Sequence, residues 1–86
     1  MMEIEQLRVF LTLAETKNFT RAAERLFVSH STVSRSLSAL EDELGVRLVE
    51  RDNHVVGLTA AGERLYERAN ELVSLADAIE EEIRGL

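Results

Sequence analysis

Residues 19–45 contain two segments with the apolar spacing of helices, joined by only three residues, Phe27-Val28-Ser29. The first segment begins after Asn18 or Thr20, either of which can cap a helix, and it runs to about Leu26. Ser29 can cap the second segment, which ends at Gly45 and carries apolar residues at spacings of four, three and four: Val33, Leu37, Leu40 and Leu44. A joint this short predicts a helix, a tight turn and a second helix that share one core.

The flanking segments complete a small fold. A further helix is predicted over 4–16, and its apolar face would pack with the other two helices. After Gly45, short β-prone runs at 46–49 and 55–58 predict a two-stranded hairpin, or wing. Thr59 can then cap a last helix that continues to about Arg84. The predicted fold is therefore mainly α: a winged helix-turn-helix over 1–58, with a three-helix core and a two-stranded wing, followed by a long dimerising linker helix over 59–86.

The last predicted helix has apolar residues repeating at alternate spacings of four and three: Leu65, Ala69, Leu72, Ala76, Ile79, Ile83 and Leu86. Such a heptad seam is typical of a helix that pairs with another helix. The seam could instead pack on the chain's own bundle. A helix of about 26 residues is roughly 39 Å long at about 1.5 Å per residue, however, and would extend beyond so small a bundle. We therefore expect a homodimer formed through this seam.

Charge is unevenly distributed along the chain, whose net charge is −6. Residues 17–38 carry four cations and one acid, a net of +3, whereas 59–86 carry three arginines and seven acids, a net of −4. An acidic total is unusual for a nucleic-acid-binding protein, but a locally basic face can still bind phosphates. A rival interpretation, favoured by the net charge and the seam, is an acidic protein-interaction module with no DNA role.

The helix predicted over 30–44 has a small, polar outer face without acids up to Leu40. Small side chains let a helix lie deep in the major groove of double-stranded DNA, and Arg35 could reach guanine or a phosphate. A solvated surface is the alternative, but such a surface would more often carry Glu, Lys or Gln than Ser. The candidate contacts on this helix are His30, Ser31, Thr32, Ser34, Arg35 and Ser38. For Thr32 and Ser38, a solvated surface position without DNA contact is an equally good interpretation.

Two further groups of residues are candidates for DNA contact. Thr20 and Arg21 open the second predicted helix, where backbone N–H groups and side chains can hold a phosphate. Arg25 could do the same or pair with an acid. In the wing, the candidates are Arg51, Asn53 and His54. Arg51 could equally stabilise the fold through a salt bridge.

Other classes of function find little support in the composition. The chain has no cysteine and two histidines, a poor basis for a metal site, and no pairing of nucleophile and base indicates an enzyme. No apolar run approaches the ~20 residues of a membrane span, and the N-terminal residues lack the layout of a signal peptide. We expect a soluble, cytoplasmic and nucleoid-associated protein with no cofactor in this chain and no membrane partner.

The motifs FTRAAERLFVS, TVSRSLSALEDELGVRLVER and LTAAG, in this order and spacing, resemble the N-terminal DNA-binding domain of LysR-type transcriptional regulators. The resemblance covers the chain from Ile4 to Leu86. It implies a homodimer through antiparallel linker helices, two recognition helices in successive major grooves, and an interrupted palindrome as the DNA site. It also implies that the full-length regulator has an effector-binding domain that senses a small molecule and drives tetramer formation. Since this domain is absent after Leu86, we expect a DNA-binding fragment of a longer regulator rather than a naturally short protein.

The sequence departs from this family pattern at several positions. His30, Ser36 and Ser38 replace residues that are often glutamine or basic, and Val49 replaces an aromatic residue. The wing lacks the usual arginines between Asp52 and Gly57. These departures leave the predicted fold unchanged, but they weaken the expected wing contact and leave the target sequence open. A winged-helix family with a different dimer arrangement is the remaining alternative.

Overall fold

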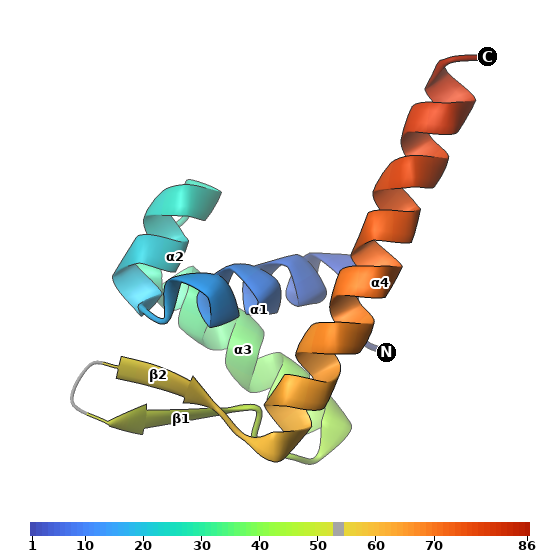
Figure 1. The fold of residues 1–86 in the computed structure, drawn as a ribbon. Coiled ribbons are helices and arrows are strands. Elements are labelled where there is room, and N and C mark those ends of the chain that lie inside the picture. Colours follow the sequence, from blue (N-terminus) through green and yellow to red (C-terminus); the bar gives the residue numbers. More distant parts are fainter. Residues whose placement is uncertain (53–54) are drawn as a thin grey trace.

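The chain folds into four helices and one two-stranded sheet, in a computed structural model that describes residues 1–52 and 55–86, with the side chains of 51, 52 and 55 excepted. In chain order the elements are α1 (Ile4–Thr16), α2 (Phe19–Leu26), α3 (His30–Leu44), β1 (Val49–Asp52), β2 (Val55–Leu58) and α4 (Ala60–Arg84). Helices α1, α2 and α3 form a bundle beside the wing, and α4 rises away from it (Figure 1). The predicted winged helix-turn-helix with a long last helix is confirmed.

Polar side chains cap three of the helices, and two of the caps are as expected. The Asn18 side chain accepts a hydrogen bond from the Arg21 N–H at 2.9 Å, so Asn18 rather than Thr20 caps α2. Ser29 Oγ accepts from the Thr32 N–H at 3.2 Å, and Thr59 Oγ1 accepts from the Gly62 N–H at 3.0 Å. Each cap satisfies an N–H that has no partner within its own helix.

Phe27 forms the sharp turn between α2 and α3. It adopts a left-handed backbone conformation with φ of 58°, and its N–H donates to the carbonyls of Ala23 and Glu24. Left-handed residues commonly end helices, but glycine is usual at such positions. The Phe27 side chain is 94% exposed, so it belongs to the turn surface and not to the core.

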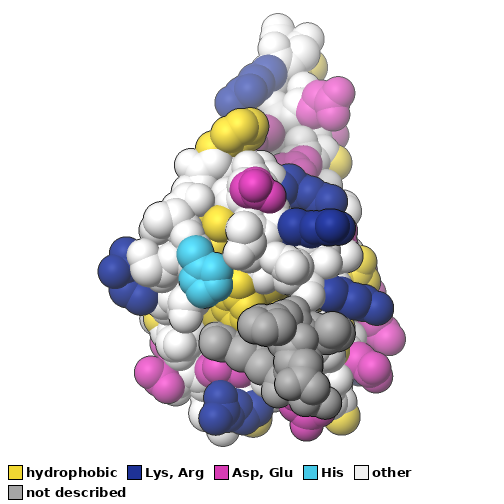
Figure 2. Space-filling model, turned by 90° about the vertical axis from the view of Figure 1, so that its left-hand side faces the viewer, with side chains coloured by type: hydrophobic (Ala, Val, Ile, Leu, Met, Phe, Trp, Pro, Cys, Tyr) yellow, Lys and Arg dark blue, Asp and Glu magenta, His cyan; other side chains and the backbone are white. Residues whose placement is uncertain are grey.

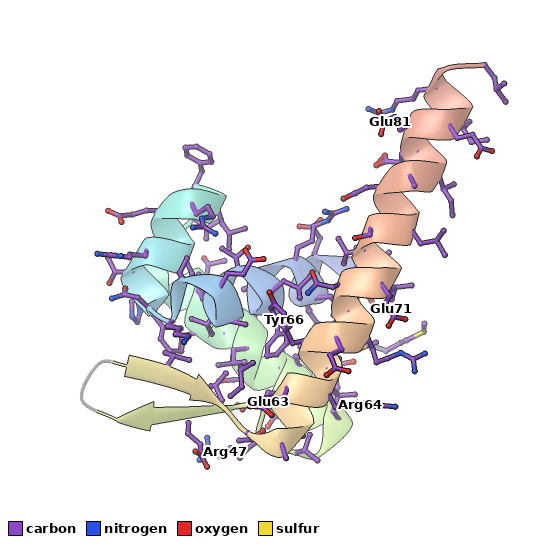
Figure 3. The ribbon with its side chains drawn as sticks, viewed as in Figure 1. Arg47, Glu63, Arg64, Tyr66, Glu71 and Glu81 are labelled. Carbon is purple, nitrogen blue, oxygen red and sulfur yellow. The ribbon has the colours of Figure 1, made fainter. Side chains whose placement is uncertain are left out.

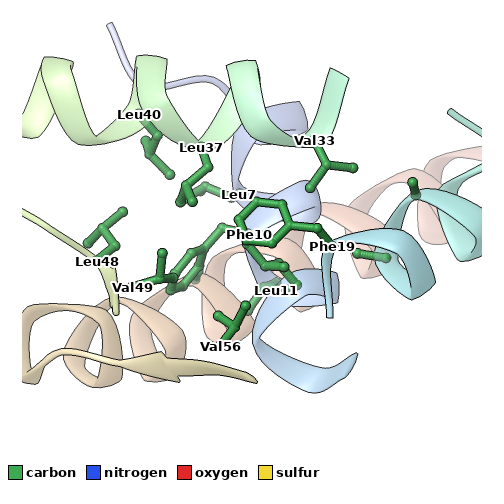
Figure 4. Packing of buried hydrophobic residues seen from close by; sticks show 14 of the residues in the cluster. Leu7, Phe10, Leu11, Phe19, Val33, Leu37, Leu40, Leu48, Val49 and Val56 are labelled. Carbon is green, nitrogen blue, oxygen red and sulfur yellow. The ribbon is translucent and has the colours of Figure 1, made fainter. Parts of the chain in front are cut away.

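The core is built around Phe10, which contributes its ring to the space between α3, α1 and the wing (Figure 4). Helix α3 supplies Leu37 and Leu40, as its apolar spacing predicts, and both are buried. The wing supplies Val49 and Val56 to the same cluster. Because strands and helices share one cluster, the wing is packed on the bundle and does not depend on its own two strands for stability.

The first strand of the wing was predicted three residues too early. It was expected at 46–49 and spans Val49–Asp52, paired antiparallel with Val55–Leu58 so that Val49 lies opposite Leu58. The N–H of Leu48 instead donates to Glu41 Oε2 at 2.7 Å, and the N–H of Val46 donates to the Glu41 carbonyl at 3.3 Å. The end of α3 therefore takes up hydrogen bonds that a strand at 46–49 would need for its partner.

Helix α4 packs on the bundle only along its N-terminal half. Ala69 and Val73 are buried, whereas Leu75, Ile79 and Ile83 are each more than half exposed. The C-terminal half extends beyond the bundle (Figure 1), and the molecule measures 48 × 26 × 20 Å along its principal axes. Among the described residues, no helix has the length and apolar character needed to cross a membrane.

Candidate nucleic-acid interface

The outer face of α3 presents a row of exposed polar side chains. His30, Ser31, Arg35 and Ser38 are exposed, as predicted. Thr32 and Ser34 are only half-buried positions at the margin of this face. The structure therefore brings the six α3 candidates together on one side of the helix, with four of them directly accessible.

A hydroxyl network occupies the start of α3. Ser29 Oγ lies 3.1 Å from Ser31 Oγ and 2.9 Å from Thr32 Oγ1, in addition to capping the helix. These contacts hold the Ser31 and Thr32 hydroxyls in defined positions. A hydroxyl has one donor and two acceptor sites, so each of these two keeps sites for directional hydrogen bonds with a DNA group.

His30 is held against the buried ring of Phe19. The two ring centroids lie 5.4 Å apart with an interplanar angle of 34°, so the rings are tilted toward one another. Aromatic pairs at this separation attract each other beyond their buried area. The contact joins the first residue of α2 to the first residue of α3 and fixes where the imidazole points. The helical spacing used to identify His30 carries no sign of this contact between two helices.

Thr20 and Arg21 lie exposed in the first turn of α2. The backbone N–H of Arg21 already donates to the Asn18 side chain, so it is engaged within the chain. The expected phosphate contact at this helix start therefore depends mainly on the Thr20 hydroxyl and the Arg21 guanidinium.

Cations divide into two groups by their partners within the described part of the chain. One group forms ion pairs: Arg8, Arg25, Arg68 and Arg84. Arg25 pairs with Glu15 at 3.3 Å, as one of its two interpretations predicts. The other group has no ion pair among the described side chains: Lys17, Arg21, Arg35, Arg47 and Arg64.

The cations without a partner are concentrated on the bundle and the wing side. Of the five, only Arg64 lies on α4, where it points away from the bundle (Figure 3). Figure 2 shows the end of the molecule that carries the wing: Lys and Arg side chains, in dark blue, lie at several separate places around a largely white area that includes one histidine, in cyan. Such a surface leaves positive charge available to a polyanion despite the net charge of −6.

A groove of about 600 Å³ separates the C-terminal half of α3 from the wing. It is lined by Leu37, Ser38, Glu41, Arg47, Val49, Glu50 and Thr59. Arg47 is exposed at its edge and points away from α4 (Figure 3). Arg47 was not predicted as a DNA contact, because residues 46–49 were expected to form a strand, whereas β1 begins at Val49. The place of Arg47 immediately after the α3 stop, next to Ser38 in the same groove, makes it a further candidate for phosphate contact.

The wing candidates differ in how far the structure describes them. Arg51 lies in β1, where its backbone pairs with Val56, and nothing is described of its side chain. Asn53 and His54 lie outside the described residues. All three remain predictions from the sequence.

The predicted dimer seam is divided between two parts of α4. Ala69 is only 2% exposed and Leu65 packs against the core, so these two belong to the chain's own fold. Ala76 is half-buried, and the remaining seam residues Leu72, Ile79 and Ile83 are exposed. A free apolar stripe thus exists, but it starts at Leu72 and is made of Leu72, Leu75, Ile79, Ile83 and Leu86.

The division follows from where α4 leaves the bundle. Leu65 and Ile83 are about five turns of 3.6 residues apart, so they lie on the same side of a straight helix. Leu65 packs against the core, whereas Ile83 is exposed because the C-terminal half of α4 extends beyond the bundle (Figure 1).

Comparison with known proteins gives a consistent result. Residues 4–63 match the family described as bacterial regulatory helix-turn-helix protein, lysR family. The chain is 41% identical over 85 residues to the HTH-type transcriptional regulator BudR of Klebsiella aerogenes, which covers 99% of this chain and 59% of BudR. The chain thus spans less than two thirds of the length of this relative.

Two solved structures share the fold over nearly their whole length. A crystal structure of a complex of the CbnR DNA-binding domain with DNA matches with a TM-score of 0.91 and 40% identity, covering 98% of this chain and 97% of that one. A crystal structure of the BenM DNA-binding domain with catB site 1 DNA matches with a TM-score of 0.93 and 35% identity, covering 96% and 93% respectively.

Proposed function

Because the chain belongs to the LysR family of bacterial helix-turn-helix regulatory proteins, we propose that it binds double-stranded DNA as a homodimer and is the DNA-binding part of a transcription regulator. The observation that carries the proposal is the outer face of α3. That face combines small hydroxyl side chains with Arg35, an exposed cation that has no acid partner among the described side chains. The CbnR and BenM domains that share this fold were crystallised with DNA.

In this proposal α3 is the recognition helix and lies in the major groove. Arg35 has the length and the two donor groups to bind guanine O6 and N7 together. His30 and Ser31, at the N-terminal end of α3, contact base edges or the adjacent backbone, with the His30 ring held in place by Phe19. Thr32, Ser34 and Ser38 complete the contact face from its margins.

Contacts to phosphates position the domain on the duplex. Thr20 and Arg21 bind the DNA backbone on one side of the major groove. Arg47, which lines the protein groove between α3 and the wing, also binds the DNA backbone. Arg51, Asn53 and His54 extend the contact from the wing toward the minor groove. None of these contacts reads a base sequence directly, so their loss weakens binding to all sequences alike.

Dimerisation uses the free apolar stripe of α4. Leu72, Leu75, Ile79 and Ile83 are each between 43% and 59% exposed in the single chain, and pairing with a second copy would bury them. A twofold dimer reads an interrupted palindrome with half-sites about one helical turn, or ~34 Å, apart. In the whole regulator we propose a small-molecule effector and assembly into tetramers, in the cytoplasm and on the nucleoid.

The test is fluorescence anisotropy of the chain on the DNA upstream of its own gene and on a scrambled duplex, at several salt concentrations. We expect tighter binding to the upstream DNA and an affinity that falls as salt rises, with a slope of about 0.9 for each phosphate neutralised. Sedimentation measured in parallel establishes that the chain is a folded dimer. A folded dimer that binds neither duplex at any salt would support the protein-interaction module instead.

A further inference from the structure

Arg8 of α1 and Asp77 of α4 form an ion pair across the two helices. Arg8 Nη2 lies 2.6 Å from Asp77 Oδ1, and Arg8 Nη1 lies 3.4 Å from Asp77 Oδ2. The two side chains therefore meet through both oxygens and both terminal nitrogens. Such a paired geometry restricts the relative orientation of the groups more than a single hydrogen bond does.

The position of the pair along α4 is what makes it informative. Ala69 and Val73 are the last buried residues of α4, and Leu75 and the residues after Ala76 are exposed. Asp77 lies one turn beyond Val73, so the pair extends the anchored part of α4 by about 6 Å along the helix axis. The pair therefore holds α4 at the place where the helix leaves the bundle.

Exposed ion pairs add little to the free energy of unfolding. Both side chains are partly exposed here, at 35% for Arg8 and 54% for Asp77. Ala69 and Val73 belong to the core cluster and Leu65 and Tyr66 pack against it, so α4 has apolar contacts with the bundle besides the pair. The pair therefore matters for the direction of α4 more than for whether α4 stays attached.

We propose that Asp77 is a positioning residue that, through Arg8, sets the direction of α4 relative to α3 and thereby the spacing of the two half-sites that a dimer accepts. The proposal rests on the proposed function, since it needs both DNA binding and pairing through α4. A tilt of about 10° at this anchor moves a group about 20 Å away by about 3.5 Å, close to the ~3.4 Å rise of one base pair. A loosened pair should therefore admit neighbouring spacings.

The experiment is a selection from a pool of random DNA duplexes, followed by sequencing of the bound fraction. It compares the unchanged chain with Asp77→Asn, which keeps the shape and removes the charge, and with the exchanged pair Arg8→Asp/Asp77→Arg. We expect the unchanged chain to enrich one half-site pair at a single spacing. Asp77→Asn should enrich the same half-site spread over about three neighbouring spacings, since each base pair shifts it by ~3.4 Å. The exchanged pair should restore the single spacing.

Glu81→Gln provides the matched control. It removes one negative charge from α4 one turn beyond Asp77, and Glu81 has no ion pair among the described side chains. Glu81 lies on the part of α4 that extends past α1 (Figure 3). This variant should keep the single spacing. Sedimentation and thermal melting confirm that every variant is a folded dimer.

The outcomes separate the two proposals. The same single spacing for Asp77→Asn as for Glu81→Gln would overturn the positioning role and leave the proposed function intact. A broad spacing in the exchanged pair would also overturn it, because restored charge should restore direction. If the unchanged chain enriches no motif, the DNA-binding function and the positioning role are both overturned.

Discussion

The α-carbon of Gly62 lies directly against the backbone carbonyl of Leu48, so that a β-carbon at residue 62 would overlap with the carbonyl oxygen. The neighbouring Thr59 reinforces this contact. Its N–H donates to the Leu48 carbonyl at 3.1 Å, and its hydroxyl donates to the Arg47 carbonyl at 2.7 Å. The start of α4 is thus joined to the segment that leads from α3 into the wing.

Gly62→Ala should destabilise the fold, because the new methyl group must displace either α4 or the 47–48 backbone. Overpacking of this kind typically costs about 1–3 kcal/mol. Thermal unfolding followed by circular dichroism measures it as a lower Tm. Gly57→Ala is the control, since a β-carbon there has no neighbour within 4 Å in the described part of the chain and should leave Tm nearly unchanged. Equal melting temperatures for the two variants would contradict the close approach at Gly62.

Arg35→Ala should weaken specific DNA binding by about 1–3 kcal/mol without changing Tm, because Arg35 is exposed and the substitution would remove the proposed contact to base edges. Anisotropy on the selected site measures the change. Arg25→Ala removes the same charge from a residue already paired with Glu15, and should have a much smaller effect. A similar loss in both variants would show that net charge matters and that Arg35 reads no base.

Arg47→Ala should weaken binding to specific and scrambled duplexes alike, because a phosphate contact carries no sequence information. The salt dependence of the affinity should fall by about 1 in slope. Arg64→Ala is the matched control, since Arg64 is also without an ion pair among the described side chains but points away from the bundle (Figure 3). An unchanged slope for Arg47→Ala would exclude a phosphate contact at this residue.

Ile79→Glu should break the dimer and leave the single chain folded, because Ile79 is 52% exposed and outside the core. Sedimentation at several concentrations should show monomers for this variant. Ser74→Glu adds the same charge at an exposed position away from the apolar stripe, and should remain dimeric. A dimer that survives Ile79→Glu would place the pairing surface elsewhere.

Acid should remove the stabilising effect of the Arg8–Asp77 pair. The Arg8 guanidinium, by hydrogen bonding and by its charge, holds the pKa of Asp77 below its usual value. A carboxyl with a lowered pKa in the folded chain stabilises the fold above its unfolded pKa, and the effect is lost as pH falls through the lowered value. The Tm difference between the unchanged chain and Asp77→Asn should therefore be small near neutral pH, since the pair is exposed, and should shrink further below about pH 4.

Glu43 has a lowered pKa as well, because Gln6 and the N-terminal amine hydrogen-bond to its carboxylate. Glu43 is present in both the unchanged chain and Asp77→Asn, so its effect cancels in the Tm difference between them. A Tm difference between the unchanged chain and Asp77→Asn that stays constant down to pH 2 would contradict the lowered pKa of Asp77.

Most helix boundaries could be predicted because their signals are local. Ser29, Gly45 and Thr59 act at the ends predicted for them, since a capping side chain needs only the backbone of its own first turn. The displaced strand depended on a longer-range contact. Glu41 accepts the Leu48 N–H from seven residues away, and no local pattern distinguishes that acid from its neighbours Asp42 and Glu43.

The candidate site shows the same contrast. The exposed side of α3 follows from its 3.6-residue period, and Arg35 is found where that period places it. The contact between Phe19 and His30 joins two helices, so it depends on their packing angle. Residue spacing also could not show which seam residues of α4 pack on the bundle and which stay exposed. The side of α4 that meets α1 is set only when the whole bundle is assembled.

Helix α4 has both buried residues and a free apolar stripe, so the folding of one copy and its pairing with a second copy can be separate events. A single copy can complete its core with Ala69 and Val73 before it meets a partner, so folding need not wait for a second chain. In the proposed dimer, substitutions at the exposed residues Leu75 or Ile79 would change which copies pair and would leave the core untouched. A bacterium with many related regulators could keep them from exchanging subunits through changes in this stripe alone.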